Sequence, residues 1–200
     1  MAMDLNFTNI FQFFSAISPL LLGFFMIMIS VFNQDLKGMV YLAGVLITTV
    51  LSVIVLNVVK SEKFLDASPT CSLVNIPFMT QFNSPSLNSV LIAFTFTYLL
   101  LPMMANKQMN YAIIGTVIAL FIIDGMTKVI HKCTSFGGVV LGMLVGAFCG
   151  FSWYTLFHVT GYDSLLYFNE TMSNRTYCSR PKKQTFKCAV YKNGQLVKTL

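Results

Sequence analysis

The most informative absence in this sequence is charge. Only 10% of the 200 residues are charged, whereas 56% are hydrophobic and the mean hydropathy is +0.71. Soluble domains normally carry about a quarter of their residues as charged side chains. The composition therefore excludes an ordinary soluble globular domain and predicts an integral membrane protein.

Metal-ligating side chains are also scarce. The chain has two histidines and five cysteines, and no histidine lies near the pair Cys178 and Cys188. Two cysteines alone do not complete a tetrahedral zinc site, so we expect no metal and no cofactor. We expect that the five cysteines form no disulfide framework and that Cys149 packs as a small hydrophobe within a helix. Whether Cys178 and Cys188 form a disulfide is left undecided.

Long apolar runs are what the sequence has in abundance. About 20 apolar residues in a helix cross the roughly 30 Å hydrocarbon core of a bilayer. Runs of that length occupy 15–33, 38–59, 86–104, 109–126 and 136–158. We read the residues before the first run, 5–14, as an interfacial lead to a retained helix, because the start lacks the basic region and cleavage site of a signal peptide.

The predicted fold class is therefore all-α, a polytopic bundle of about five transmembrane helices formed by residues 1–158. A basic tail follows in residues 159–200, with seven Lys and Arg minus two Asp and Glu giving +5. Asn193 and Gly194 lie between short alternating stretches and form the preferred pair for a two-residue hairpin turn. We expect a small β-hairpin in the tail.

The distribution of Lys and Arg predicts the orientation, because short cytoplasmic loops carry an excess of positive charge. An odd number of spans places the two termini on opposite sides. The N-terminus and the loops 61–85 and 127–135 are predicted to be extracytoplasmic or lumenal, and the C-terminus cytoplasmic. The cytoplasmic group is the larger: Lys37, Lys107, Arg175, Arg180, Lys182, Lys183, Lys187, Lys192 and Lys198, against Lys60, Lys63, Lys128 and Lys132.

Two local patterns predict how helices pack. Glycines 138, 142, 146 and 150 are spaced four apart, which lays a smooth stripe on one helix face and lets a neighbouring backbone come close. Asp124 precedes Lys128 by four residues, so on a continuous helix the two side chains share a face and can pair. That pair is either functional or an interfacial anchor that fixes helix depth.

Three segments are similar to the motifs of a known family. NSPSLNS at 83–89 resembles P-S-G-H, TKVIHKCTSFGG at 127–138 resembles S-R-x5-H-x3-D, and Lys60 before Ser68 and Pro69 partly resembles K-x6-R-P. These are the motifs of the type 2 phosphatidic acid phosphatase superfamily, which includes lipid phosphate and polyprenyl diphosphate phosphatases. The resemblance covers about 60–150, and it implies a phosphatase-like core there with the three motifs on one side of the membrane.

The residues that carry the family's chemistry are substituted. Asn88 stands at the place of the second-motif histidine, Thr134 at that of the nucleophilic histidine and Gly138 at that of the orienting aspartate. The family's reaction needs a nucleophile with a lone pair at neutral pH and a proton donor for the leaving group. We therefore expect no catalytic residue at these places. His131, beside Cys133, is the displaced candidate for a nucleophile.

Part of a phosphate-binding site remains under this resemblance. Lys60, Ser86, Lys128 and Lys132 stand at or near the motif places, and cations and hydroxyls bind phosphate oxygens with or without a nucleophile. The alternative is that the lysines are ordinary interfacial anchors.

The leading functional expectation is a catalytically inactive member of the phosphatase fold with a structural or adaptor role. The alternatives are an active lipid phosphatase that uses displaced residues, and a structural protein of a viral or organellar membrane. Expected partners are membrane lipids, including phosphorylated head groups, and an acidic protein or anionic lipid at the tail. We expect no nucleic-acid partner, and whether the protein forms an oligomer is left undecided. Transport is disfavoured because Asp124 is the lone charge within the predicted spans.

Overall fold

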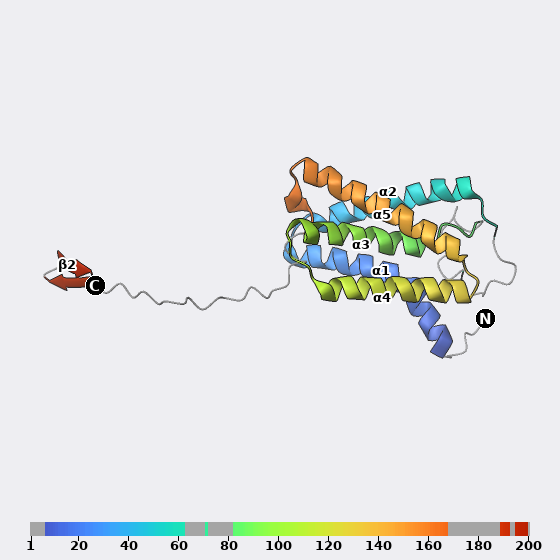
Figure 1. Ribbon diagram of the computed structural model, residues 1–200, viewed down its shortest axis with the longest axis horizontal. Coiled ribbons are helices and arrows are strands. Elements are labelled where there is room, and N and C mark those ends of the chain that lie inside the picture. Colours follow the sequence, from blue (N-terminus) through green and yellow to red (C-terminus); the bar gives the residue numbers. More distant parts are fainter. Residues whose placement is uncertain (1–6, 63–70, 72–81, 168–188, 193–194, 200) are drawn as a thin grey trace.

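The computed structural model describes residues 7–62, 71, 82–167, 189–192 and 195–199, with five long helices (Figure 1). The helices are α1 (Phe7–Asn33), α2 (Lys37–Val59), α3 (Leu87–Ala105), α4 (Tyr111–Ile130) and α5 (Phe136–Val159). Each is long and apolar enough to cross a membrane. The prediction of a multi-pass bundle of about five helices is confirmed.

Short elements follow the last long helix. A 3-10 turn, η2, covers Asp163–Leu165. The strands β1 (Ala189–Lys192) and β2 (Gln195–Thr199) pair antiparallel. The turn expected at 193–194 lies outside the described residues, so the tail hairpin stays a prediction.

The ends of the helices differ from the predicted spans in two places. Helix α1 begins at Phe7, so the described part of the expected interfacial lead is continuous with the first membrane helix. Helix α4 continues to Ile130 rather than ending at 126. Asp124 and Lys128 therefore share one continuous helix.

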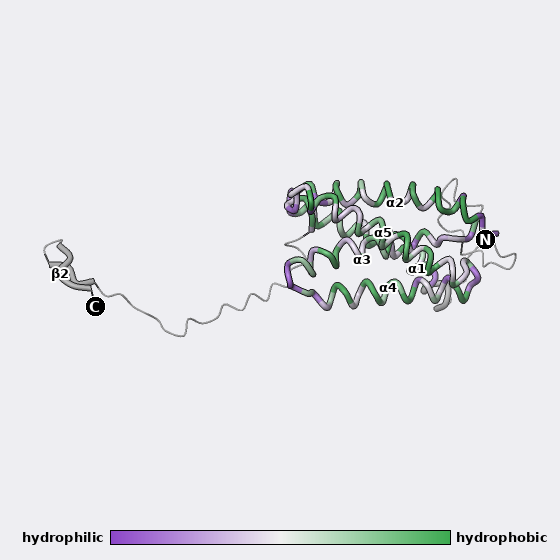
Figure 2. Tube along the Cα trace, turned by 45° about the horizontal axis from the view of Figure 1, so that its top comes forward, coloured by the Kyte–Doolittle hydropathy of each residue, from purple (hydrophilic) through white to green (hydrophobic). Residues whose placement is uncertain are grey.

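Helix α3 lies at the centre of the bundle. More than half of its span, 56%, is buried inside the structure, against 17% to 33% for the other four helices. Figure 1 shows α2 and α5 on one side of α3 and α1 and α4 on the other. Figure 2 shows hydrophobic residues along the helices and hydrophilic residues gathered near their ends.

The glycines of α5 form its contact with α3, which we call the glycine seam. A Cβ placed on Gly142 would lie 2.8 Å from the Ser86 carbonyl oxygen, and one on Gly150 would lie 2.7 Å from that of Phe94. A Cβ on Gly146 would overlap the Val90 carbonyl. These approaches require glycine, and they confirm that the stripe receives a neighbouring backbone.

The helices alternate in direction, which gives the bundle two distinct ends. We call the end that holds Val59, Leu87, Ile130 and Phe136 the motif end, since it contains the segments 83–89 and 127–138. The other is the opposite end.

The opposite end contains a cluster of buried rings that we call the aromatic cluster: Tyr41, Phe94, Tyr98 and Tyr167. Neighbouring centroids lie 5.7 to 6.5 Å apart. The Tyr167 hydroxyl donates to the Met26 carbonyl of α1. The packed bundle thus extends to Tyr167, beyond the residue 158 expected from the sequence.

Candidate functional site

The motif segments meet at the motif end and are joined by hydrogen bonds. The Ser86 N–H donates to the Gly138 carbonyl at 3.1 Å, and the Thr134 hydroxyl donates to the Asn83 carbonyl at 2.7 Å. The Asn83 N–H donates to Ser61 at 3.0 Å, next to Lys60. Segments near residues 60, 85 and 135 therefore form one connected structure.

Asp124 lies at the centre of a group that we call the polar cluster: Ser15, Ser86, Asn88, Asp124 and Lys128. The Asp124 side chain is 1% exposed, and its Oδ1 accepts hydrogen bonds from Ser15 Oγ and Asn88 Nδ2, each at 3.0 Å. Its Oδ2 lies 3.7 Å from Lys128 Nζ. The predicted pairing of Asp124 with Lys128 is confirmed. Because the carboxylate also binds α1 and α3, it does more than fix the depth of one helix.

Pro19 explains the position of Asn88. A proline within a helix has no N–H to donate to the carbonyl four residues earlier, which here is that of Ser15. Ser18 Oγ donates to this carbonyl at 2.9 Å, and Asn88 Nδ2 approaches it at 3.3 Å. Asn88 Nδ2 also lies 3.4 Å from the Ala16 carbonyl. Asn88 therefore supplies from α3 a donor that α1 lacks, as a break in a membrane helix requires.

The first turns of α1 bend away from the bundle (Figure 1). Kinks of this kind are typical of a proline within a helix. Ser15, four residues before Pro19, bonds to Asp124 through its hydroxyl. The kink and the polar cluster therefore belong to one arrangement.

Lys128 and Ser86 are the phosphate-binding candidates that the structure brings together. Lys128 Nζ donates to Ser86 Oγ at 3.2 Å, and the Lys128 side chain is 19% exposed. Ser86 is the N-cap residue of α3, but its side chain makes no capping hydrogen bond. The Ser86 hydroxyl thus accepts from a lysine instead of from the first turn of its own helix.

Lys60 and Lys132 flank this pair as exposed residues. Lys60 follows the last residue of α2 and Lys132 lies in the turn between α4 and α5. Both adopt a left-handed backbone conformation, with φ of 46° and 54°. The four candidates therefore share the motif end, two in direct contact and two at its exposed rim.

Two of the substituted positions are filled by internal contacts. Thr134 is 4% exposed, and its hydroxyl is committed to the Asn83 carbonyl. A Cβ at Gly138 would overlap Thr134 Oγ1 and lie 3.0 Å from Ser84 Oγ. An aspartate at residue 138 would therefore displace both neighbours.

A disulfide joins Cys71 to Cys133 across a sequence separation of 62 residues. The expectation that no disulfide framework forms was wrong at this pair, because the fold brings the two loops to the same end. Cys149 is free and buried, as predicted. Cys178 and Cys188 lie outside the described residues.

His131 lies at the C-terminal cap of α4. Asp124, the nearest carboxylate before it in sequence, bonds to Ser15, Asn88 and Lys128 instead. Among the described residues, no carboxylate forms an ion pair or hydrogen bond with His131. A displaced nucleophile would therefore lack the orienting group that the chemistry needs.

Reasoning from the sequence did not find Ser15 or the role of Pro19. The available signal was Pro19 itself, since a proline inside an apolar helix frees a carbonyl that must find another donor.

Comparison of the chain with protein-family models, curated proteins and solved structures found no match.

Proposed function

We propose that the protein is a catalytically inactive membrane protein of the phosphatase fold with a structural or adaptor role. The observation that carries this proposal is the bonding of Asn88. At the place where the family has a proton-donating histidine, an amide binds Asp124 and the Ser15 carbonyl, which Pro19 leaves without its helical donor. A primary amide does not supply a proton to a leaving group at neutral pH.

The remaining chemistry supports the same conclusion. A thiolate, not a disulfide, is the nucleophilic form of cysteine, and Cys133 is bonded to Cys71. The Thr134 hydroxyl donates a hydrogen bond to the Asn83 carbonyl, and a carbonyl oxygen is not a general base. Asn88, Cys133 and Thr134 are therefore engaged in internal bonds instead of activating a nucleophile.

Retention of a phosphate head group is a second candidate function. It is favoured by Lys128 Nζ and Ser86 Oγ, 3.2 Å apart at the start of α3, with Lys60 and Lys132 at the same end. Asp124 opposes it, because a phosphate at Lys128 would approach a carboxylate 3.7 Å from the ammonium. Binding would therefore depend strongly on the two exposed lysines.

The disulfide supports the orientation proposed from the charges. Disulfides persist in oxidising compartments and are rare in the cytosol. Cys71 and Cys133 both lie at the motif end. We infer that this end is extracytoplasmic or lumenal and that the basic tail is cytoplasmic, where it would meet an acidic protein or anionic lipid.

The first test measures phosphate release from phosphatidic acid and from a polyprenyl diphosphate by purified protein in detergent. We expect no release above that of a His131→Ala variant and a Thr134→Ala variant prepared in parallel. Turnover that His131→Ala abolishes would overturn the proposal and make the protein a phosphatase with a displaced nucleophile.

Head-group retention is tested by thermal unfolding with the same lipids. Phosphatidic acid should raise the Tm of the wild type more than phosphatidylcholine does, and Lys60→Ala with Lys132→Ala should remove the difference. Lys107→Ala, at the opposite end, is the matched control. Equal shifts for both lipids would leave an inactive fold without a head-group site.

A further inference from the structure

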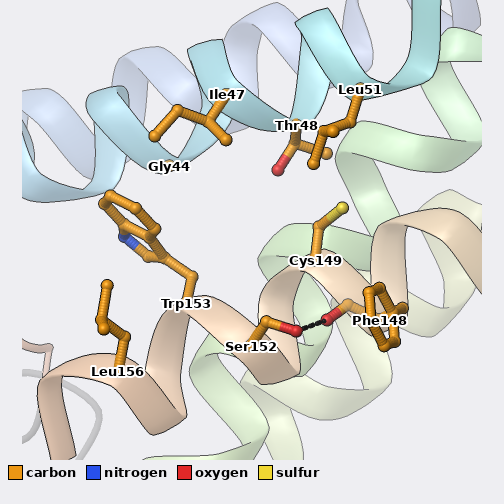
Figure 3. A pocket seen from close by; sticks show the side chains of 9 residues that line it. All are labelled: Gly44, Ile47, Thr48, Leu51, Phe148, Cys149, Ser152, Trp153 and Leu156. Carbon is orange, nitrogen blue, oxygen red and sulfur yellow. Dashed lines mark hydrogen bonds between the residues drawn. The ribbon is translucent and has the colours of Figure 1, made fainter. Parts of the chain in front are cut away.

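A groove separates α2 from α5 within the membrane-spanning part of the bundle. It has a volume of about 290 Å3. Figure 3 shows side chains of both helices facing this space. The lining residues are Gly44, Ile47, Thr48 and Leu51 of α2, and Phe148, Cys149, Ser152, Trp153 and Leu156 of α5.

The groove is closed where α2 and α5 approach each other most closely. A Cβ on Gly44 would lie 2.7 Å from Trp153 Nε1. This indole N–H donates to the Val40 carbonyl of α2 at 3.2 Å. Gly44 and Trp153 therefore set the spacing of the two helices at one end of the groove.

The groove lies at hydrocarbon depth. At 1.5 Å per residue, Gly44 is about 10 Å from the start of α2 at Lys37, and Leu51 is about 12 Å from its end at Val59. Both positions lie well inside a hydrocarbon core of roughly 30 Å. Bulk water is therefore not available to fill the groove from the bilayer side.

The groove is lined mainly by apolar side chains, and its polar side chains do not require a polar ligand. Ser152 Oγ donates to the Phe148 carbonyl of its own helix at 2.8 Å, drawn as the dashed line in Figure 3. Thr48 and Cys149 face each other in Figure 3. What remains exposed to an occupant is mainly hydrocarbon and aromatic surface.

The groove is short compared with a transmembrane helix. Its lining runs from Phe148 to Leu156 on α5, about 12 Å at 1.5 Å per residue, whereas a helix that crosses the hydrocarbon core is about 30 Å long. A linear hydrocarbon chain is narrower than a helix and can lie along a groove of this length.

We propose that the α2–α5 groove is a binding site for one hydrocarbon chain of a membrane lipid. The chain is bound by dispersion contacts with Ile47, Leu51, Phe148 and Trp153, which would otherwise have no neighbour on that side. This site is independent of the head-group site proposed above, since none of its lining residues belongs to the polar cluster.

Photolabelling tests the proposal. The full-length protein is placed in nanodiscs containing phosphatidylcholine with a diazirine in the middle of one acyl chain. This lipid has no net charge, so labelling does not require a phosphate-selective site. After irradiation, the modified residues are mapped by mass spectrometry.

The expected result is an excess of adducts on groove residues over exposed residues elsewhere at similar depth. The reference residues are Ile118 and Ile122 of α4, which are 43% and 50% exposed. Labelling in proportion to exposure alone would overturn the proposal.

A pair of variants makes the test specific. Ser152→Phe fills the mouth of the groove, and groove labelling should fall to the level seen on α4. Thr116→Phe is the matched control. The Thr116 hydroxyl likewise bonds to its own helix at 2.8 Å, but Thr116 is an exposed residue of α4, a helix that does not line the groove. If Ser152→Phe does not fold, Ile47→Phe fills the same space from α2. Unchanged labelling in a folded groove-filling variant would contradict the proposal.

Discussion

At the motif end, α1, α3 and α4 are joined through one buried carboxylate, whereas at the opposite end α1, α2, α3 and the segment after α5 are joined through packed rings. Asp124 has its partners at 3.0 and 3.7 Å. The aromatic cluster instead distributes its contacts over four rings that are at most 2% exposed. A charged contact fails when one partner is removed, but ring packing degrades gradually.

This difference bears on function. The opposite end combines packed rings with hydrogen bonds such as those of Tyr41 to Thr95 and of Tyr167 to the Met26 carbonyl, whereas the motif end is built around the almost fully buried Asp124. Buried polar residues in a membrane are costly and usually mark a functional place. Here Asp124 Oδ1 accepts from Ser15 and Asn88 while Oδ2 lies beside Lys128, so one buried carboxylate connects α1 and α3 to α4.

The largest effect is expected at the glycine seam, which links the two ends along α3 and α5. Gly146→Val places a side chain on the Val90 carbonyl, and overpacking of this kind costs about 3 kcal/mol. The free energy of unfolding, measured by SDS titration in detergent, should fall by that amount.

Gly115→Ala is the control for Gly146→Val. Nothing lies within 4 Å of a Cβ at Gly115, so the variant should gain about 0.5 kcal/mol of stability from helix propensity. Equal losses for the two variants would show that the seam is not the close contact described here.

The next largest effect is expected for Asp124→Leu. It leaves Lys128 without its counter-ion and Ser15 and Asn88 without their acceptor. Removing one partner of a buried pair costs about 3 kcal/mol, and we expect somewhat less because Lys128 is 19% exposed. The double variant Asp124→Leu with Lys128→Met should recover most of the loss in the same titration. If the double variant is as unstable as the single one, the unpaired Lys128 is not the cause of the lost stability.

A smaller effect is expected for Asn88→His, which introduces the residue that the phosphatase motif has at this place. An imidazole N–H cannot replace the amide contacts to Asp124 Oδ1 and the two α1 carbonyls together, so stability should fall by about 1.5 kcal/mol. No phosphate release should appear. Asn88→Gln, which keeps an amide, is the control, and activity gained by Asn88→His would mean that the rest of the site is still competent.

Sequence patterns predicted the features that depend on neighbours along the chain. Five apolar runs predicted the five helices, and the i, i+4 spacing predicted the pair of Asp124 and Lys128. The four-residue spacing of glycines predicted a close helix contact, but not that α3 provides it. Local spacing determines which face a residue occupies, and it does not identify what packs there.

Contacts between distant segments could not be predicted in the same way. Cys71 and Cys133 lie in separate loops and meet because the helices between them return to one end. Tyr41, Tyr98 and Tyr167 are far apart in the sequence, and no local pattern indicates that their rings meet. The motif comparison treats Asn88 as a substitution for histidine, whereas its bond to the carbonyl freed by Pro19 depends on the packing of α3 against α1.

The smallest effect is expected for Tyr41→Phe in the aromatic cluster. The Thr95 hydroxyl donates to the Leu91 carbonyl at 2.9 Å, so the Tyr41 hydroxyl is the donor in its 2.7 Å contact with Thr95. Tyr41→Phe removes this one hydrogen bond and leaves the ring in place, which should lower the free energy of unfolding by about 1 kcal/mol. Tyr111→Phe, at an exposed position on α4, is the control and should be neutral. A loss as large as that of Asp124→Leu would mean that the opposite end also depends on individual polar contacts, and the contrast between the two ends would not hold.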